Sequence, residues 1–287
     1  MNDTTIFALD TVITIKISDN NNELLSACSQ MINDYENIFS KTIPASDIAQ
    51  FNNSDKVSMS DIELIKKSID IAAKTHGNFN PALGTVTKLW HDSIPDEIDL
   101  SHTDYTKINI DGNELIKSDS KLQLDLGGIA KGYICEKVTD YLIAQGVDYG
   151  VLSFGGNISV FGDRTWEIGI QSPYDTDDIV GNLKIDSGYV SVSGDYQRYF
   201  EMGGKRYHHI IDPTTGYPVD NGVNSVVVWC DDGTLADALS TALFVMGADD
   251  GMKFHESNIY DFEVMYITKD GLHMSDGFRQ HFTEKAT

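Results

Sequence analysis

The sequence is poor in cysteine. Cys28, Cys135 and Cys230 are the three cysteines in 287 residues, and they are widely spaced and odd in number. Such spacing fits neither a disulfide framework nor a zinc-binding pattern. Cys28 and Cys135 lie in apolar helical patterns, so all three are expected to be small buried hydrophobic residues.

Long apolar runs are also missing. The longest, such as residues 226–229 and 242–246, fall far short of the roughly 20 residues that a transmembrane helix needs. Residues 1–10 contain no basic stretch followed by an apolar core, so no signal peptide is predicted. Glycine and proline are not elevated and hydrophobic residues make up 41% of the chain, which argues against disorder and collagen-like repeats.

Basic residues are scarce relative to acidic ones. The chain has 21 Lys and Arg against 44 Asp and Glu, a formal net charge of -23. This charge repels DNA, RNA and anionic membrane surfaces, so nucleic acid is not expected as a partner. A phosphorylated ligand would need local help from backbone N–H groups, a metal ion or a single lysine.

The first part of the chain mixes one strand-like run with helical patterns. Residues 5–17 read as a strand, and apolar residues then recur at helical spacing from Leu24 to Ile38. A second helix is predicted over residues 61–75, and a third short one ends near Trp90. Residues 91–106 read as an acidic connector. A chain of this length fits one large domain or two interlocked lobes over residues 1–287.

The second part is rich in strands. Short strands are predicted at residues 108–110, 114–116, 122–124, 157–161, 166–170, 189–192, 196–202 and 223–229. Helices are predicted at 128–144 and 234–246, and a short helix and a strand around 262–267 end the chain. Helices at both ends of a strand-rich middle favour an α+β fold with a mainly antiparallel sheet.

The segment Asp125-Leu-Gly-Gly-Ile-Ala-Lys131-Gly132 turns from a strand through two glycines into a helix. The first turn of a helix offers unpaired N–H groups and the positive end of its dipole, which together favour an anion. Lys131, one turn in, can pair with a phosphate. The glycine spacing matches neither a Walker loop nor a dinucleotide fingerprint. An ordinary glycine-rich turn with a solvated lysine explains the segment equally well.

Asp237 and Thr241 are spaced i and i+4 on a helix that is otherwise mostly apolar. A carboxylate buried on such a helix is costly unless it is paired or binds a metal. A carboxylate and a hydroxyl one turn apart can place two oxygens on a hard cation such as Mg²⁺. An aspartate that is simply hydrogen-bonded within the fold is the equal alternative.

Two neighbouring histidines precede a turn in Tyr207-His208-His209-Ile-Ile-Asp212-Pro. Neighbours on a strand point to opposite faces, so both cannot bind one ion, although one of them can act as a general base. Two further segments, residues 153–157 and 191–195, combine serine and glycine. They can line a ligand channel, or they can be hairpin turns.

Taken together and in this order, these segments resemble the ApbE family of FAD:protein FMN transferases. The resemblance begins at residues 7–11 (Phe-Ala-Leu-Asp-Thr) and continues through residues 39–52, Gly77-Asn-Phe-Asn-Pro-Ala-Leu-Gly84 and Leu89-Trp90 to the segments above. It covers nearly the whole chain. Each piece is weak alone, but six or more in family order make coincidence improbable.

The resemblance implies a T-fold-related architecture and a Mg²⁺-dependent enzyme. Such an enzyme breaks the pyrophosphate of FAD, its substrate, and transfers FMN to a Thr or Ser hydroxyl of a target protein, releasing AMP. By position, the Gly128 carbonyl with the side chains of Asp237 and Thr241 would hold Mg²⁺. Asp125 and Lys131 would contact FAD, and His209 would help to deprotonate the acceptor hydroxyl.

The remaining FAD contacts implied by the resemblance are Thr42, Asn78, Phe79, Asn80 and Ile211. The chain departs from many relatives at some of these places. Thr42 stands where an aromatic residue often lies near the flavin, Asn80 stands where Asp is common, and residues 9 and 10 are Leu-Asp in place of Met-Gly.

The resemblance also implies a partner, an acceptor protein with the motif Asp-x-x-Thr/Ser-Gly-Ala-Thr/Ser. The segment Asp212-Pro-Thr-Thr215-Gly216 begins this way but continues Tyr217-Pro218, so self-flavinylation is not predicted. Many relatives are exported lipoproteins, and this chain has no lipobox cysteine near its start. It is therefore expected to be cytoplasmic, or else a membrane-anchored extracytoplasmic protein whose leader was removed.

Other functions fit parts of this pattern. A Mg²⁺-dependent FAD pyrophosphatase would use the same site, with water as the nucleophile, to give FMN and AMP. A non-catalytic flavin-binding protein would bind FAD without regard to metal. An interaction module that uses the acidic surface gives no reason for the Asp125–Lys131 loop and ranks last.

Overall fold

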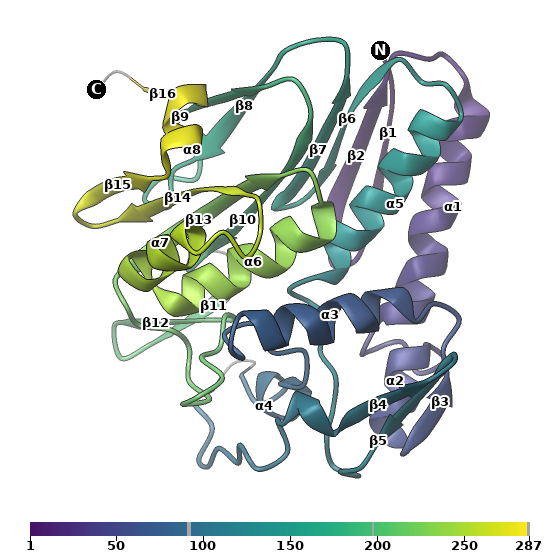
Figure 1. Ribbon diagram of the computed structural model, residues 1–287, viewed down its shortest axis with the longest axis vertical. Coiled ribbons are helices and arrows are strands. Elements are labelled where there is room, and N and C mark those ends of the chain that lie inside the picture. Colours follow the sequence, from purple (N-terminus) through teal and green to yellow (C-terminus); the bar gives the residue numbers. More distant parts are fainter. Residues whose placement is uncertain (91–92, 197, 286–287) are drawn as a thin grey trace.

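The central feature of the described chain is an eight-stranded antiparallel sheet (Figure 1). The computed structural model describes residues 1–90, 93–196 and 198–285. The strands follow one another across the sheet in the order β1 (Asn2–Ala8), β2 (Thr11–Ile17), β6 (Tyr149–Phe154), β7 (Asn157–Gly162), β10 (Gly188–Gly194), β13 (Val223–Cys230), β14 (Glu263–Thr268) and β15 (Gly271–Met274). All neighbours pair antiparallel, so the predicted α+β fold with a mainly antiparallel sheet is confirmed.

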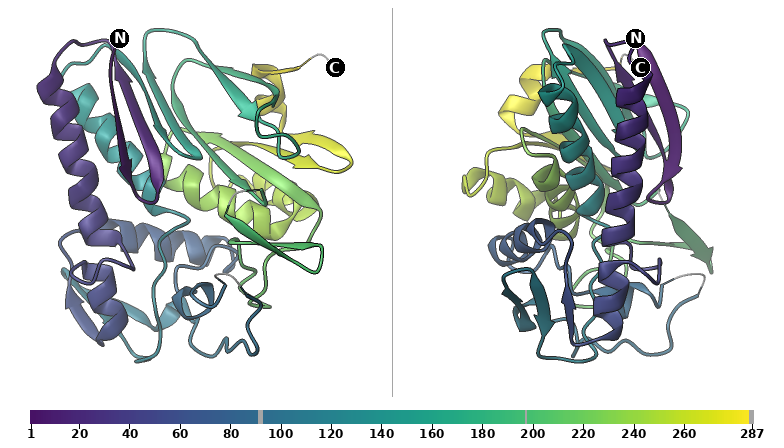
Figure 2. Two further views of the ribbon diagram at one scale, coloured as in Figure 1. Left: turned by 180° about the vertical axis from the view of Figure 1, so that it is seen from behind. Right: turned by 90° about the vertical axis from the view of Figure 1, so that its right-hand side faces the viewer.

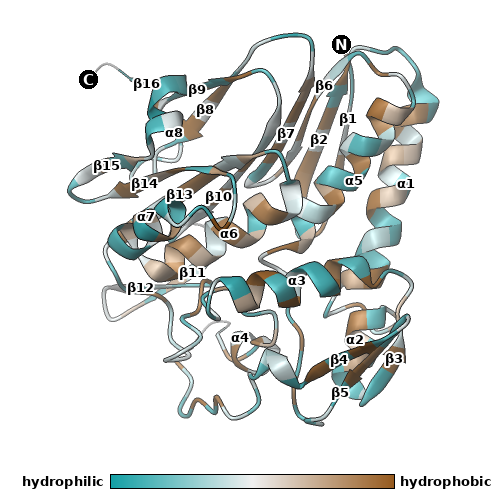
Figure 3. Ribbon diagram, in the orientation of Figure 1, coloured by the Kyte–Doolittle hydropathy of each residue, from teal (hydrophilic) through white to brown (hydrophobic). Residues whose placement is uncertain are grey.

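Helices cover one face of this sheet (Figures 1 and 2). They are α1 (Asn22–Phe39), α5 (Ala130–Ala144), α6 (Gly233–Met246) and α7 (Ala248–Glu256). Ile13 and Ile15 of β2 share an apolar core with Ile134 of α5, and Val226 of β13 shares another with Leu239 of α6. The apolar stripes of these helices are visible in Figure 3.

The opposite face is covered over part of its width by a second, three-stranded sheet. This sheet has the order β16 (Phe282–Glu284), β9 (Ile179–Ile185), β8 (Trp166–Gln171), and α8 (Asp276–His281) packs beside it. Val227 of β13 belongs to the core on this side, whereas Val226 and Val228 belong to the core under α6. Because side chains alternate along a strand, β13 is buried on both faces, which explains its unbroken apolar run.

A smaller group of elements lies at the end of the large sheet, at the bottom of Figure 1. It contains α2 (Asp47–Asn53), β3 (Lys56–Ser58), α3 (Glu63–Lys74), α4 (Gly84–Thr87), η1 (Tyr105–Lys107), β4 (Ile108–Asp111) and β5 (Glu114–Lys117). The three strands pair in the order β3-β5-β4. A separate hairpin of β11 (Tyr199–Met202) and β12 (Lys205–His208) leads into residue 209.

The structure corrects several predicted elements. Residues 5–17 do not form one strand, because Leu9 and Asp10 take φ values of 54° and 56° and turn the chain into the β1–β2 hairpin. Residues 122–124 are no strand of a sheet, and Gln123 forms an isolated parallel bridge with Leu83. The strand predicted at 196–202 covers Tyr199–Met202, and α2 was not predicted. Residues 91–92 of the predicted connector, and residue 197, lie outside the described residues.

Within the described ranges, no helix combines the length and the apolar character that crossing a bilayer requires.

Helices α5 and α6 meet backbone to backbone at two glycines. A Cβ atom on Gly132 would lie 2.1 Å from the carbonyl oxygen of Gly233 and 2.5 Å from Cβ of Asp237. A carboxylate of each helix also accepts a hydrogen bond from an N–H group in the first turn of the other helix. The Gly132 N–H donates to Asp237 Oδ2 at 2.8 Å, and the Thr234 N–H donates to Glu136 Oε2 at 3.0 Å. Each helix thus satisfies an N–H in the first turn of the other, where intrahelical partners are lacking.

Replacing Gly132 by alanine tests this contact. In an open helix position, Gly→Ala stabilises by up to about 1 kcal/mol. Here the added methyl group meets backbone atoms that have no rotamer to escape to, so Gly132→Ala is expected to lower the free energy of unfolding by about 2–3 kcal/mol. Urea unfolding measures this, with Asp140→Ala at an exposed position of α5 as the control. A Gly132→Ala variant as stable as the unmodified protein would contradict the described contact.

Candidate active site

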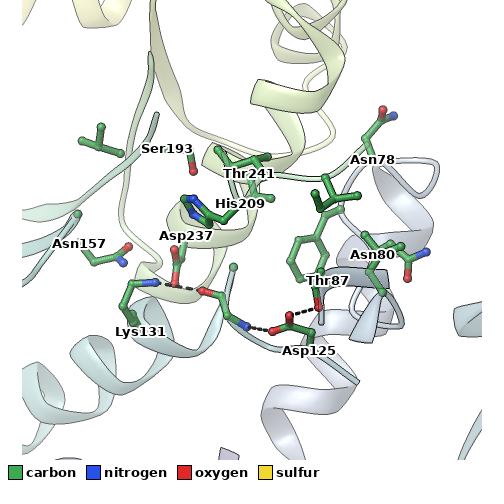
Figure 4. A pocket seen from close by; sticks show the side chains of 18 residues that line it. Asn78, Asn80, Thr87, Asp125, Lys131, Asn157, Ser193, His209, Asp237 and Thr241 are labelled. Atoms are coloured by element: carbon green, nitrogen blue, oxygen red, sulfur yellow. Dashed lines mark hydrogen bonds between the residues drawn. The ribbon is translucent and has the colours of Figure 1, made fainter. Parts of the chain in front are cut away.

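A cavity lies at the end of the large sheet where β7 begins and β10 ends, against α5 and α6 (Figure 4). Ten of the eleven predicted site residues line it: Asn78, Phe79, Asn80, Asp125, Gly128, Lys131, His209, Ile211, Asp237 and Thr241. Thr42 is not among the lining residues, and its hydroxyl lies 3.1 Å from that of Ser40. Segments from four distant parts of the sequence are thus brought to one place.

Asp125 is held by three hydrogen-bond donors. Its Oδ1 accepts from the Gly127 N–H at 3.0 Å, and its Oδ2 accepts from the Thr87 hydroxyl at 2.6 Å and from Lys41 Nζ at 2.5 Å. Burial raises the pKa of the Asp125 carboxyl, but the charge of Lys41 and these hydrogen bonds outweigh burial and leave the pKa below its usual value. The side chain is therefore an ionised and fixed hydrogen-bond acceptor.

The segment Asp125–Gly132, predicted to bind an anion, uses most of its backbone N–H groups for hydrogen bonds within the protein. The N–H groups of Ile129 and Ala130 donate to the carbonyl of Leu126, at 3.1 and 2.9 Å. Those of Gly127 and Gly132 donate to Asp125 and Asp237. These four donors are not available to a ligand, which corrects the expectation of free N–H groups. Lys131 lines the cavity, and its ammonium group donates to the Gly127 carbonyl at 3.0 Å.

The three predicted metal-site residues come together from two elements. Asp237 is only 4% exposed, lines the cavity and accepts the Gly132 N–H through Oδ2. Thr241 lies one turn further along α6, and a Cβ atom on Gly128 would be 3.0 Å from its Oγ1. Asp237 is therefore hydrogen-bonded within the fold, as one of the two readings from the sequence has it, and it also lines the cavity.

The available donors are oxygens. Among the residues that the structure describes, no group of three or more His, Cys, Asp or Glu is placed to hold a metal. The Asp237 carboxylate and the Thr241 hydroxyl line the cavity together with Gly128. Oxygen donors are the kind that suits a hard cation such as Mg²⁺, which keeps waters and ligand phosphates in its shell.

The two histidines have different environments. His208 is 6% exposed; its Nε2 lies 2.9 Å from the Val219 carbonyl, and its Nδ1 accepts from the Ile210 N–H at 3.3 Å. These partners select the neutral tautomer with the proton on Nε2, and burial lowers the pKa of His208. His209, the next residue, is exposed and lines the cavity. The imidazole of His209 is thus the one that a ligand can reach.

The wall made by residues 78–80 is fixed by the fold. The Asn80 side chain donates to the Thr103 carbonyl and accepts from the Ala82 N–H, at 2.9 and 2.8 Å. Asn78 donates to the Thr75 carbonyl at 2.8 Å, and Phe79 is 3% exposed. These side chains shape the cavity more than they offer free polar groups to it.

Some lining residues were left open or missed by the sequence. Gly156, Asn157 and Ser193 line the cavity. Residues 153–157 also contain the hairpin turn from β6 to β7, with Gly155 at φ 69°, whereas residues 191–194 lie within β10 and form no hairpin turn. Thr87 and Lys41 were missed. Lys41 is separated from Asp125 by 84 residues, so no local pattern could reveal their pairing.

The fold is that of a known class of proteins. The sequence model of the ApbE family matches residues 9–266. The chain belongs to the ApbE family.

Relatives and solved structures agree with this assignment. A Klebsiella pneumoniae (strain 342) protein named FAD:protein FMN transferase is 33% identical over 275 residues, which cover 90% of this chain and 86% of that protein. The crystal structure of the ApbE protein from Thermotoga maritima superposes with a TM-score of 0.89 at 30% identity and covers 99% of both chains. The flavin transferase ApbE from Vibrio cholerae gives a TM-score of 0.84 at 28% identity, with 98% of this chain and 99% of that chain covered.

Proposed function

We propose that this chain transfers FMN from FAD to a serine or threonine hydroxyl of an acceptor protein and releases AMP. The observation that carries the proposal is the convergence of an oxygen-donor set, a lysine and a reachable histidine on one cavity. Relatives that share most of the chain's length are named FAD:protein FMN transferase, which supports the same activity.

The reaction requires one bond to form and one to break. The acceptor hydroxyl oxygen bonds to the flavin-side phosphorus of FAD, and the bond from that phosphorus to the bridging oxygen breaks. AMP leaves with the electron pair, and the hydroxyl proton passes to a base. Such a transfer needs in-line positioning of the groups and neutralisation of the phosphate oxygens.

Asp237, Thr241 and the carbonyl of Gly128 are proposed to hold Mg²⁺. Their fit rests on the contact of Gly128 with Thr241 and on the burial of Asp237 beside the cavity. When bound there, Mg²⁺ neutralises charge on the phosphate oxygens. Lys131 provides a second positive charge against the same phosphates, which an acidic chain would otherwise repel.

His209 is proposed to take the proton of the acceptor hydroxyl, because it is exposed at the cavity whereas His208 is committed to Val219. Asp125 is proposed to accept a hydrogen bond from FAD. Asn78, Phe79, Asn80 and Ile211 are proposed to form the wall against which the ligand lies. Thr42, which does not line the cavity, is proposed to contact the ligand from outside this wall. The acceptor is proposed to carry Asp-x-x-Thr/Ser-Gly-Ala-Thr/Ser.

The proposed function is tested by incubating the protein with FAD, Mg²⁺ and an acceptor domain that carries this motif. We expect AMP release together with an acceptor heavier by one FMN group, and loss of both products when EDTA removes the metal. Mass spectrometry of the acceptor and chromatography of the nucleotides measure the two products. AMP release without added FMN mass would instead indicate a pyrophosphatase, and metal-independent FAD binding without AMP would indicate a flavin-binding protein.

Asp237→Ala tests the metal site. Removal of the one carboxylate in the set is expected to lower the rate of AMP release by about 100-fold or more at saturating FAD. Asp249→Ala, at an exposed position at the start of α7, makes the same change of charge and is expected to retain the full rate. Unchanged turnover in Asp237→Ala would refute the metal assignment.

His209→Gln tests the base. We expect the transfer rate to fall by about 10²–10⁴-fold, because general base catalysis typically contributes this much, while the Kd for FAD changes little. The matched control is His273→Gln at an exposed position of β15. A His209→Gln variant that transfers FMN at more than a fifth of the unmodified rate would exclude the role as base.

A further inference from the structure

Lys41 contacts two residues that line the cavity, although it is not itself a lining residue. It follows α1 in the chain, and its Nζ lies 2.5 Å from Asp125 Oδ2 and 3.5 Å from Thr87 Oγ1. Asp125 and Thr87 both line the cavity, and Figure 4 shows them pointing toward each other on the side away from Lys131. Lys41 is exposed and does not line the cavity, so its effect on the cavity runs through these two side chains.

The charge and the direction of Asp125 depend on this lysine. The Asp125 side chain is only 14% exposed, and a carboxylate withdrawn from water takes up a proton unless a cation or hydrogen bonds compensate. The Gly127 N–H fixes Oδ1, and Lys41 with Thr87 fixes Oδ2. Lys41 is the one full positive charge in this set of three donors.

The charge balance of the cavity points the same way. Among the described residues that line the cavity, Asp125 and Asp237 carry negative charge and Lys131 carries positive charge. With Lys41 included, two positive charges balance the two negative charges. Without it, the cavity would be net negative toward a pyrophosphate, in a chain whose formal net charge is already -23.

We propose that Lys41 is a positioning residue for FAD. It holds the Asp125 carboxylate ionised and aimed at the cavity, so that this carboxylate accepts a hydrogen bond from a donor group of the bound FAD. An ionised carboxylate only accepts, which means that the recognised group of the ligand carries an N–H or O–H. This inference rests on the proposed function, because that function supplies the identity of the ligand.

Two other lysines are near enough to require a control. Lys131 of α5 donates to the carbonyl of Gly127, the residue whose N–H binds Asp125. Lys88 follows Thr87 directly, but it is exposed and donates to Gln123 Oε1 at 2.9 Å. Lys88→Met therefore makes the same change of charge as Lys41→Met in the same neighbourhood without touching the Asp125 carboxylate.

The experiment measures the Kd for FAD by quenching of flavin fluorescence between pH 5 and 8, without acceptor. Lys41→Met is expected to weaken binding at pH 6 by about tenfold or more, which is typical for loss of a charged hydrogen bond. Lys41 is a cause of the lowered pKa of Asp125, so its removal is expected to raise this pKa and to move the loss of affinity on the acid side to a higher pH. Lys41→Arg is expected to restore both the affinity and the pH profile, and Lys88→Met to match the unmodified protein.

A double-mutant cycle shows whether Lys41 affects FAD binding through the Asp125 carboxylate. If Lys41 acts through Asp125, Lys41→Met is expected to change the Kd by less than about twofold in an Asp125→Asn background. Full additivity of the two substitutions, or an unshifted pH profile in Lys41→Met, would overturn the proposal. Thermal unfolding of each variant shows whether it is folded, and Lys41→Gln replaces any Lys41→Met protein that is not.

The same experiment separates this inference from the proposed function. An unmodified protein that does not bind FAD, or that binds it and does not move FMN to an acceptor, contradicts the proposed function. An unmodified protein that binds FAD, together with Lys41→Met of equal affinity and pH profile, contradicts the role of Lys41 alone.

Discussion

The hydrogen bond from the Gly132 N–H to the Asp237 carboxylate is the contact on which the site depends. It exists only because Gly132 and Gly233 let the backbones of α5 and α6 touch. A buried carboxylate is normally unfavourable, but here it meets an N–H in the first turn of a helix, where the dipole is positive and no intrahelical partner is available. The same contact places Gly128, in the loop before α5, against Thr241. One hydrogen bond therefore stabilises the buried carboxylate and brings the residues of the proposed metal site together.

The acidity of the chain sets the second constraint. A protein of formal net charge -23 that handles a dinucleotide must create a local region in which phosphate is not repelled. The backbone of residues 125–132 offers fewer free N–H groups to a phosphate than its glycine-rich sequence suggests. Most of these N–H groups donate to Asp125, to Asp237 or to the carbonyl of Leu126. In the proposed function, compensation falls to side-chain ammonium groups and to a bound cation. Lys41 contacts Asp125, and Lys131 contacts the carbonyl of Gly127.

The antiparallel sheet provides the platform for these parts. The turn between β6 and β7, the end of β10 and the segment after β12 meet at one end of the sheet, where α6 crosses it. Serine and asparagine side chains bind one another there, as Ser191 with Asn157 and Ser193 with Ser240, and connect the strands to α6. Backbone groups of the fold hold Asn80, which lines the cavity, and the buried His208.

The sequence by itself determined what depends on short spacing. The helical i, i+4 relation put Asp237 and Thr241 on one face, the glycine loop preceded a helix, and strand alternation separated His209 from His208. Order along the chain was enough to identify the family. Only the tertiary structure decided which N–H groups are already bound and which lysine meets Asp125. Those outcomes depend on contacts between segments up to 105 residues apart, which no local periodicity encodes.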